Sequence, residues 1–183
     1  PRFLPAECIR GGHEATIAKL RCGPDEHPIG VPIFGSDPAA MGDAAAFVTD
    51  VFAPDFIDIN FGCPVKKVVK RNGGSGCLKD LTLVAGIIRG VRARTHLPVT
   101  AKIRSGWNEE MRDPAAIAHV CEDAGAAVIA LHARSRTQMY QGKAHWGEDA
   151  AVGNAGGGPG AGEGERPGGA AVRASQCKGG GAR

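Results

Sequence analysis

The stretch that decides the fold is FIDINFGCPVKK, residues Phe56–Lys67. An apolar run with the character of a β-strand ends at Asn60, and a glycine and a proline then enclose Cys63. Glycine and proline interrupt regular structure, so the cysteine is expected directly beyond the carboxyl end of a strand. A cysteine in that place is a packed core residue, a metal ligand or a reactive group. The rest of the sequence is needed to choose among these.

The chain on either side of this stretch alternates between strand-like and helix-like segments. Three helices are expected to begin at an aspartate N-cap, and two of these caps are followed by proline at the first helical position. The expected strands cover His27–Gly35, Asp55–Asn60, Leu97–Arg104 and Ala126–Arg134, and the expected helices begin at Asp37, Asp80 and Asp113. Strands that alternate with helices at this spacing predict βαβ units and a parallel α/β sheet. The strands read as apolar on both faces, which is typical of buried parallel strands.

Polar side chains gather where each expected strand ends. Asn60 and Cys63 follow one strand, Lys102 and Arg104 end the next, and a third ends with a histidine and an arginine, His132 and Arg134. Such an arrangement is typical of the active face of a (β/α)₈ TIM barrel. A doubly wound sheet would also place its site there, but no GxGxxG or GxxxxGK[ST] motif follows any strand.

Composition narrows the class of protein. The chain has 183 residues, of which 43% are hydrophobic and 22% charged, with a net charge of +3. The six cysteines form no CxxC pair, which argues against a zinc ribbon or a thioredoxin-type site. No apolar run approaches the roughly 20 residues of a membrane span, and the opening residues PRFLPAECIRGG lack signal-peptide character. We therefore expect a cytoplasmic protein that uses neither membrane nor metal; its oligomeric state stays open.

A change of composition near Gly153 divides the chain. Twelve of the 28 glycines lie between there and Arg183, and this segment has no Leu, Ile, Phe, Trp or Tyr. It cannot bury enough apolar surface to offset its ordering entropy. We expect a partial TIM-barrel domain over residues 1–150 and a disordered, Gly-rich tail over residues 151–183. The tail is either a genuine flexible segment or the out-of-frame translation of GC-rich DNA.

Three ordered motifs resemble one family. INFGCPVKKVVKRNGGSGCL, PVTAKIRSGW and LHARSRTQMYQGKAHW, in this order and spacing, resemble the bacterial tRNA-dihydrouridine synthases with a GCPxKKV core. The resemblance extends from about Phe3 to Trp146. It implies a TIM barrel that uses FMN, with NADPH as reductant, to reduce the C5=C6 bond of uridine in tRNA.

The resemblance also implies roles for single residues. Hydride would pass from flavin N5 to uracil C6, and Cys63 would deliver the proton to C5. An ordinary thiol is mostly protonated at neutral pH, so this role suits a cysteine. The remaining roles implied are flavin contacts for Lys102, His132 and Arg134, and substrate contacts for Asn60, Lys66 and Lys67.

Several features depart from the family pattern. The family's flavin-binding glutamine falls at Pro32, which lacks an amide side chain. The first barrel strand and the C-terminal part are expected to be missing, so whether this piece binds FMN or is active stays open. Two other functions also remain open: an FMN barrel that reduces free pyrimidines, as dihydroorotate dehydrogenase-like enzymes do, and a non-catalytic RNA-binding remnant.

Overall fold

The computed structural model describes residues 4–6, 9, 24–141, 143–145, 147–148, 152 and 171–172. Within them lies one sheet, in which the strands follow one another in the order of the sequence and all neighbours are parallel. The strands are β1 (Leu4–Pro5), β2 (Gly30–Phe34), β3 (Phe56–Asn60), β4 (Val99–Arg104), β5 (Val128–His132) and β6 (Ala171–Val172). The expected strands are therefore confirmed as β2 to β5, whereas β1 and β6 were not predicted.

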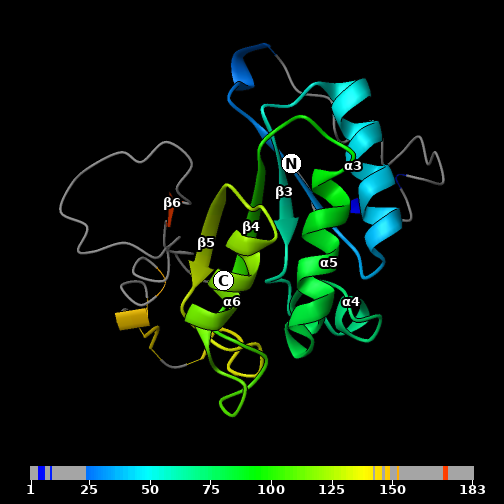
Figure 1. The fold of residues 1–183 in the computed structure, drawn as a ribbon. Coiled ribbons are helices and arrows are strands. Elements are labelled where there is room, and N and C mark those ends of the chain that lie inside the picture. The colour runs from blue at the N-terminus through cyan, green and yellow to red at the C-terminus, as the bar shows by residue number, and fades with distance from the viewer. Residues whose placement is uncertain are drawn as a thin grey trace, which may run out of the picture.

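The strand order distinguishes between the two architectures that the sequence left open. A doubly wound sheet reverses direction at a switch point, so that consecutive strands are not all neighbours. Here every strand pairs with its successor, as in a barrel that winds in one direction. The fold is a partial TIM barrel. Figure 1 shows β3 and β5 pointing the same way, toward the loops at the lower edge of the picture.

The three main helices begin where the aspartates predicted. Helices α3 (Pro38–Phe52), α5 (Leu81–Arg92) and α6 (Pro114–Asp123) each start after an aspartate whose side chain accepts a backbone N–H of the first turn. The caps are Asp37, Asp80 and Asp113. Helix α3 packs on α5 and α5 packs on α6, which forms a continuous outer layer (Figure 1).

The two faces of the sheet differ, which corrects the expectation that both are apolar. Ile57 and Ile59 of β3 are buried in the same core as the inner residues of α3 and α5. Asp58, which alternates with them, is only half-buried. The β4 strand repeats the pattern, with Val99, Ala101 and Ile103 buried and Lys102 half-buried. Polar residues therefore lie on the face opposite the helices, which is the inner face of the barrel.

The connection from β3 to α5 contains two short elements that the sequence did not predict. The four-residue helix α4 (Lys66–Val69) follows the Cys63 loop, and the 3₁₀ helix η3 (Gly74–Lys79) leads to α5. The turn expected over Arg71–Gly76 lies between them, with φ of 53° at Asn72 and 55° at Gly74. A backbone reversal thus brings residues 74–75 back to Cys63.

Most of the Gly-rich segment 151–183 lies outside the described residues, so its expected disorder stays a prediction; Ala171 and Val172 alone form β6 beside β5. The upstream motif RGGHEATIAKL lies outside them as well. In the part of the chain that the structure describes, no helix has both the length and the apolar character of a membrane span.

Candidate active site

The expected site residues lie at the carboxyl ends of three adjacent strands. Asn60 on β3 is the register partner of Lys102 on β4. Two residues further along β4, Arg104 is the register partner of His132 on β5. The sheet therefore brings Asn60, Lys102, Arg104 and His132 to one edge, as the strand-end pattern of the sequence predicted.

Cys63 lies in a loop that is held from two sides. The Oδ1 atom of Asn60 accepts hydrogen bonds from the backbone N–H groups of Gly62 and Cys63, both at 3.0 Å. On the other side, Ser75 donates to the carbonyl oxygen of Cys63 from its hydroxyl, at 2.8 Å, and from its backbone N–H, at 3.1 Å. Asn60 thus shapes the backbone that carries the cysteine, a role distinct from the substrate contact expected of it.

The Cys63 thiol differs from the other described cysteines in its exposure. Cys63 is half-exposed, whereas Cys77 and Cys121 are buried. Burial raises the pKa of both buried thiols to about 12, which keeps them protonated and unreactive. Among the cysteines that the structure describes, Cys63 is therefore the one suited to chemistry with a bound molecule.

Gly74 packs directly against Cys63. Its φ of 55° lies in the left-handed region that glycine adopts without steric penalty. A methyl group at this position would lie 2.8 Å from the Cys63 carbonyl oxygen and 2.9 Å from Cys63 Cβ. The backbone conformation and the close contact both require glycine here.

Arg104 links the Cys63 loop to the loop after β5. Its side chain is 1% exposed, and its Nε donates to the Gly62 carbonyl at 2.9 Å. Its Nη1 donates to the carbonyls of Ser135 at 3.1 Å and Met139 at 2.9 Å. The guanidinium also lies over the Tyr140 ring, 5.4 Å from the centroid. A single buried cation thus fixes the two loops relative to each other.

His132 is held in its neutral form. Burial and then the positive charges of Arg104, Lys102 and Arg134 together lower the pKa of His132 to about 4. The Nη1 atom of Arg134 lies 3.1 Å from His132 Nε2. Because a guanidinium only donates, Nε2 accepts and the ring proton is on Nδ1. The neutral imidazole can therefore donate one hydrogen bond, through Nδ1–H.

A carboxyl group lies one layer below these cations on the inner face. Thr100 donates to Asp58 Oδ1 at 2.6 Å. Burial raises the pKa of Asp58, while the Thr100 hydrogen bond and the charge of Lys102 act in the opposite direction. The inner face thus contains positive charge at its rim and a carboxyl group below it.

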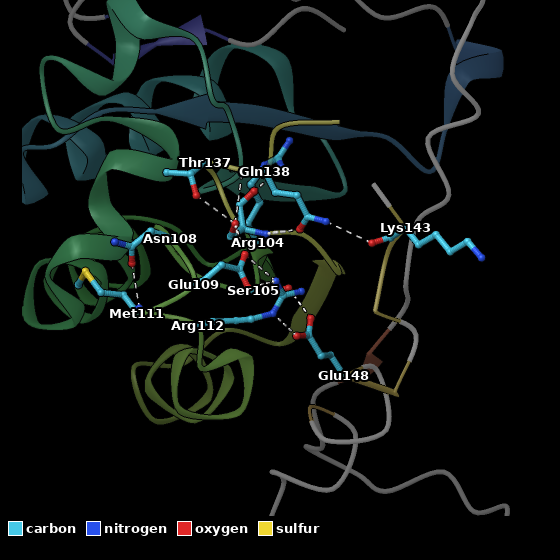
Figure 2. A network of polar contacts seen from close by, with 11 residues as sticks. Arg104, Ser105, Asn108, Glu109, Met111, Arg112, Thr137, Gln138, Lys143 and Glu148 are labelled. Atoms are coloured by element: carbon cyan, nitrogen blue, oxygen red, sulfur yellow. Dashed lines mark hydrogen bonds and ion pairs between the residues drawn. The ribbon is translucent and has the colours of Figure 1, made fainter. Parts of the chain in front are cut away.

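A polar network fixes the long loop between β4 and α6. Figure 2 shows Arg112 between Glu109 and Glu148, and it donates to both carboxylates. Ser135 donates to Glu109 at 2.9 Å, which ties this loop to the one after β5. The Ser135 hydrogen bond and then that of Arg112 lower the pKa of Glu109, so the carboxylate stays ionised. Both loops at the rim are therefore anchored independently of any ligand.

Three residues to which the family resemblance draws attention, Lys66, Lys67 and Pro32, lie away from the strand-end residues described above. Lys66 and Lys67 are exposed on α4, beyond the Cys63 loop. Pro32 lies in the middle of β2 and is the register partner of Asp58 in the middle of β3, so the position of the family's glutamine lies within the sheet and not at the strand ends. The described residues hold no group of three or more metal-ligating side chains.

Sequence reasoning missed the supporting residues: Arg104 was noted only as a polar strand end, and no role was expected for Ser75 or Glu148. The signal for Arg104 was available, because a charged residue two positions beyond Lys102 shares its face of the strand. Ser75 left no signal, since a hydroxyl in a Gly-rich turn is an ordinary turn residue.

Comparison with known proteins agrees with these observations. The profile of the family described as dihydrouridine synthase (Dus) matches residues 3–155. The chain is 40% identical to tRNA-dihydrouridine synthase B of Pseudomonas aeruginosa over 139 residues, which cover 76% of the chain and 41% of that protein. It is 45% identical over 116 residues to the protein of the same name from Shewanella oneidensis, covering 63% of the chain and 36% of the relative. It is 37% identical over 135 residues to the probable tRNA-dihydrouridine synthase 1 of Synechocystis, and this alignment covers 73% of the chain and 38% of the relative. The matched region thus spans about two fifths of the length of these relatives.

Proposed function

We propose that this chain carries the proton-donating part of an enzyme that reduces uridine in tRNA to dihydrouridine. The proposal proceeds from the family, because the chain belongs to the dihydrouridine synthases. The observation that supports this most directly is the half-exposed Cys63, held at a strand end by Asn60 and Ser75. The same proposal takes the protein to be cytoplasmic and tRNA to be its partner. FMN as cofactor and NADPH as reductant belong to the same proposal.

The residues on β4 and β5 fit a flavin. Lys102 on β4 and His132 at the end of β5 lie at one edge of the sheet, and Arg134 just beyond β5 contacts His132, which groups two cations with a neutral imidazole. Cations beside the N1–C2=O region of a flavin stabilise the negative charge of its reduced form. When bound, FMN would supply the hydride. Pro32 offers no amide on β2, so we assign the flavin contacts to Lys102, His132 and Arg134 alone.

Each residue of the chain then has a defined task. Cys63 holds the proton that is delivered to uracil C5, and its accessible thiol permits this transfer. Asn60 holds the backbone of the loop that carries the thiol, and we also assign to it a contact with the same base. Lys102 supplies positive charge, and His132 donates from Nδ1. The target base must leave its stack to reach this edge.

The cations of α4 fit the polyanionic partner. Lys66 and Lys67 directly follow the Cys63 loop and are exposed. Phosphate contacts of this kind position an RNA without reading its sequence. We assign them to tRNA phosphates near the reacting uridine.

The experiment uses full-length protein, FMN, NADPH and an unmodified tRNA transcript, with dihydrouridine measured by mass spectrometry of the digested RNA. We expect reduction by the parent protein, loss of reduction in Cys63→Ala, and retention in Cys121→Ala, which removes a buried thiol. Reduction of free uracil or orotate in place of tRNA would contradict the proposal and favour a free-pyrimidine reductase. Binding of tRNA without any reduction would favour the RNA-binding remnant.

A further inference from the structure

A small pocket opens beside the Cys63 loop at the carboxyl ends of β1 and β2. Its volume is about 210 Å³. Pro5, Phe34 and Val68 form apolar walls, and Lys67 and Arg71 of the α4 region lie at its rim. The described residues that line it include no carboxylate.

One layer of atoms separates this pocket from Cys63. Val68, on its wall, would lie 3.2 Å from a methyl group placed at Gly73 or at Gly74. Gly74 in turn touches Cys63. A molecule in the pocket would therefore lie close to the loop that carries Cys63.

The two cations at the rim are arranged to meet an anion. Lys67 and Arg71 are four residues apart and both are exposed. Both side chains line the same small pocket, so their like charges repel each other across it. Neither forms an ion pair with a carboxylate among the residues that the structure describes. An anion between them would remove the repulsion.

The size of the pocket limits what it can hold. Sites for whole cofactors and drug-sized ligands measure about 300–1,000 Å³. A pocket of about 210 Å³ is too small for the three fused rings of a flavin and suits a single planar ring system. An aromatic wall beside a pair of cations is the combination that binds a base together with its phosphate.

We propose that this pocket binds one nucleotide of the RNA substrate adjacent in the chain to the uridine that is reduced. The base lies against Phe34 and Val68, and its phosphate lies between Lys67 and Arg71. This assignment rests on the proposed function, because it takes RNA as the substrate. It gives Lys67 and Arg71 a specific phosphate as their shared partner and assigns a binding role to Phe34.

The test measures binding of a fluorescein-labelled, unmodified tRNA transcript to the full-length protein over a range of salt concentrations. Phe34→Ala should weaken binding about 5- to 150-fold, the effect of losing one stacked base, without changing the salt dependence. Arg71→Ala should lower the slope of log K against log [salt] by about 1, because one phosphate contact is lost. Arg89→Ala, which removes an exposed arginine from α5, is the matched control and should change neither quantity. Phe34→Leu, with far-UV circular dichroism, separates loss of the aromatic face from loss of folding.

The outcomes distinguish this inference from the proposed function. If Phe34→Ala and Arg71→Ala bind tRNA like Arg89→Ala while Cys63→Ala still abolishes reduction, the pocket assignment is wrong and the reaction stands. If Phe34→Ala loses flavin absorbance in place of RNA affinity, the pocket belongs to the cofactor and the assignment is also wrong. If the variants behave as expected but Cys63→Ala still reduces uridine, the RNA subsite stands and the proton donor is another group.

Discussion

Replacing Gly74 with alanine tests whether the position of Cys63 depends on its contact with this glycine. The left-handed backbone at residue 74 costs an L-residue about 1–2 kcal/mol. The added methyl group would also lie 2.8 Å from the Cys63 carbonyl oxygen and 2.9 Å from Cys63 Cβ. Carbon atoms in contact are normally about 3.5–4.0 Å apart, so the Cys63 loop must move by several tenths of an ångström or more. Overpacking of this kind adds about 1–3 kcal/mol.

The expected result is a loss of about 2–5 kcal/mol in the free energy of unfolding and a fall in kcat that can reach about 100-fold. A displacement near 1 Å at a reacting group is sufficient for such a fall. Denaturant unfolding gives the stability. Dihydrouridine formation at saturating tRNA gives kcat, and the alkylation rate of Cys63, followed by peptide mass spectrometry, shows whether the thiol has moved.

The matched control is Gly86→Ala. Gly86 lies within α5, where the nearest atom to an added methyl group is Pro38 Cγ at 3.5 Å, an ordinary contact. Alanine in a helix interior is more stable than glycine by about 0.5–1 kcal/mol, so this variant should gain stability and keep its activity. The reasoning is refuted if Gly74→Ala unfolds like the parent and its Cys63 is alkylated and catalytically active at the parent rate.

Three other variants test the support of the site. Arg104→Lys should lower kcat with little change in the KM for tRNA, because an ammonium cannot reach all three carbonyls that the guanidinium bridges; unchanged kcat in steady-state assays would argue against this positioning role. In the folded protein the pKa of His132 is about 4, below the ordinary value of 6.5. As pH falls, the unfolded state therefore binds the proton before the folded state does. The contribution of neutral His132 to the free energy of unfolding is complete above about pH 6.5 and is lost as pH falls toward 4. Urea unfolding from pH 4 to 8 should show this loss in the parent, and His132→Gln should lack it. Asp58→Asn should raise stability at neutral pH, since burial raises the pKa of this carboxyl and the amide still accepts from Thr100; a fall in melting temperature would contradict the assignment.

The sequence predicted the fold because each decision was local. The alternation of apolar strands with capped helices depends on residues a few positions apart, and the aspartate caps Asp37, Asp80 and Asp113 all form as expected. The supporting contacts are not local. Arg104 reaches the Gly62 carbonyl across 42 residues of sequence, and Ser75 reaches the Cys63 carbonyl across 12. Both bind backbone atoms, which every residue has, so no pairing of side-chain types could reveal them.

Because His132 is neutral, the positive charge at this edge of the sheet comes from Lys102, Arg104 and Arg134 and not from the histidine. Burial and then the charges of Arg104, Lys102 and Arg134 lower the pKa of this histidine, so a fourth positive charge is excluded from the edge. Arg104 already directs its donors to three backbone carbonyls, and Arg134 donates to His132 Nε2. Under the proposed function, Lys102 is the residue assigned to the negative charge that would develop on a bound flavin or uracil. His132 can contribute one neutral Nδ1–H donor, which orients a ligand without neutralising its charge. Replacing Lys102 with methionine should therefore reduce kcat more than replacing His132 with glutamine, and the reverse order in a side-by-side kinetic comparison would assign the electrostatic role to the histidine.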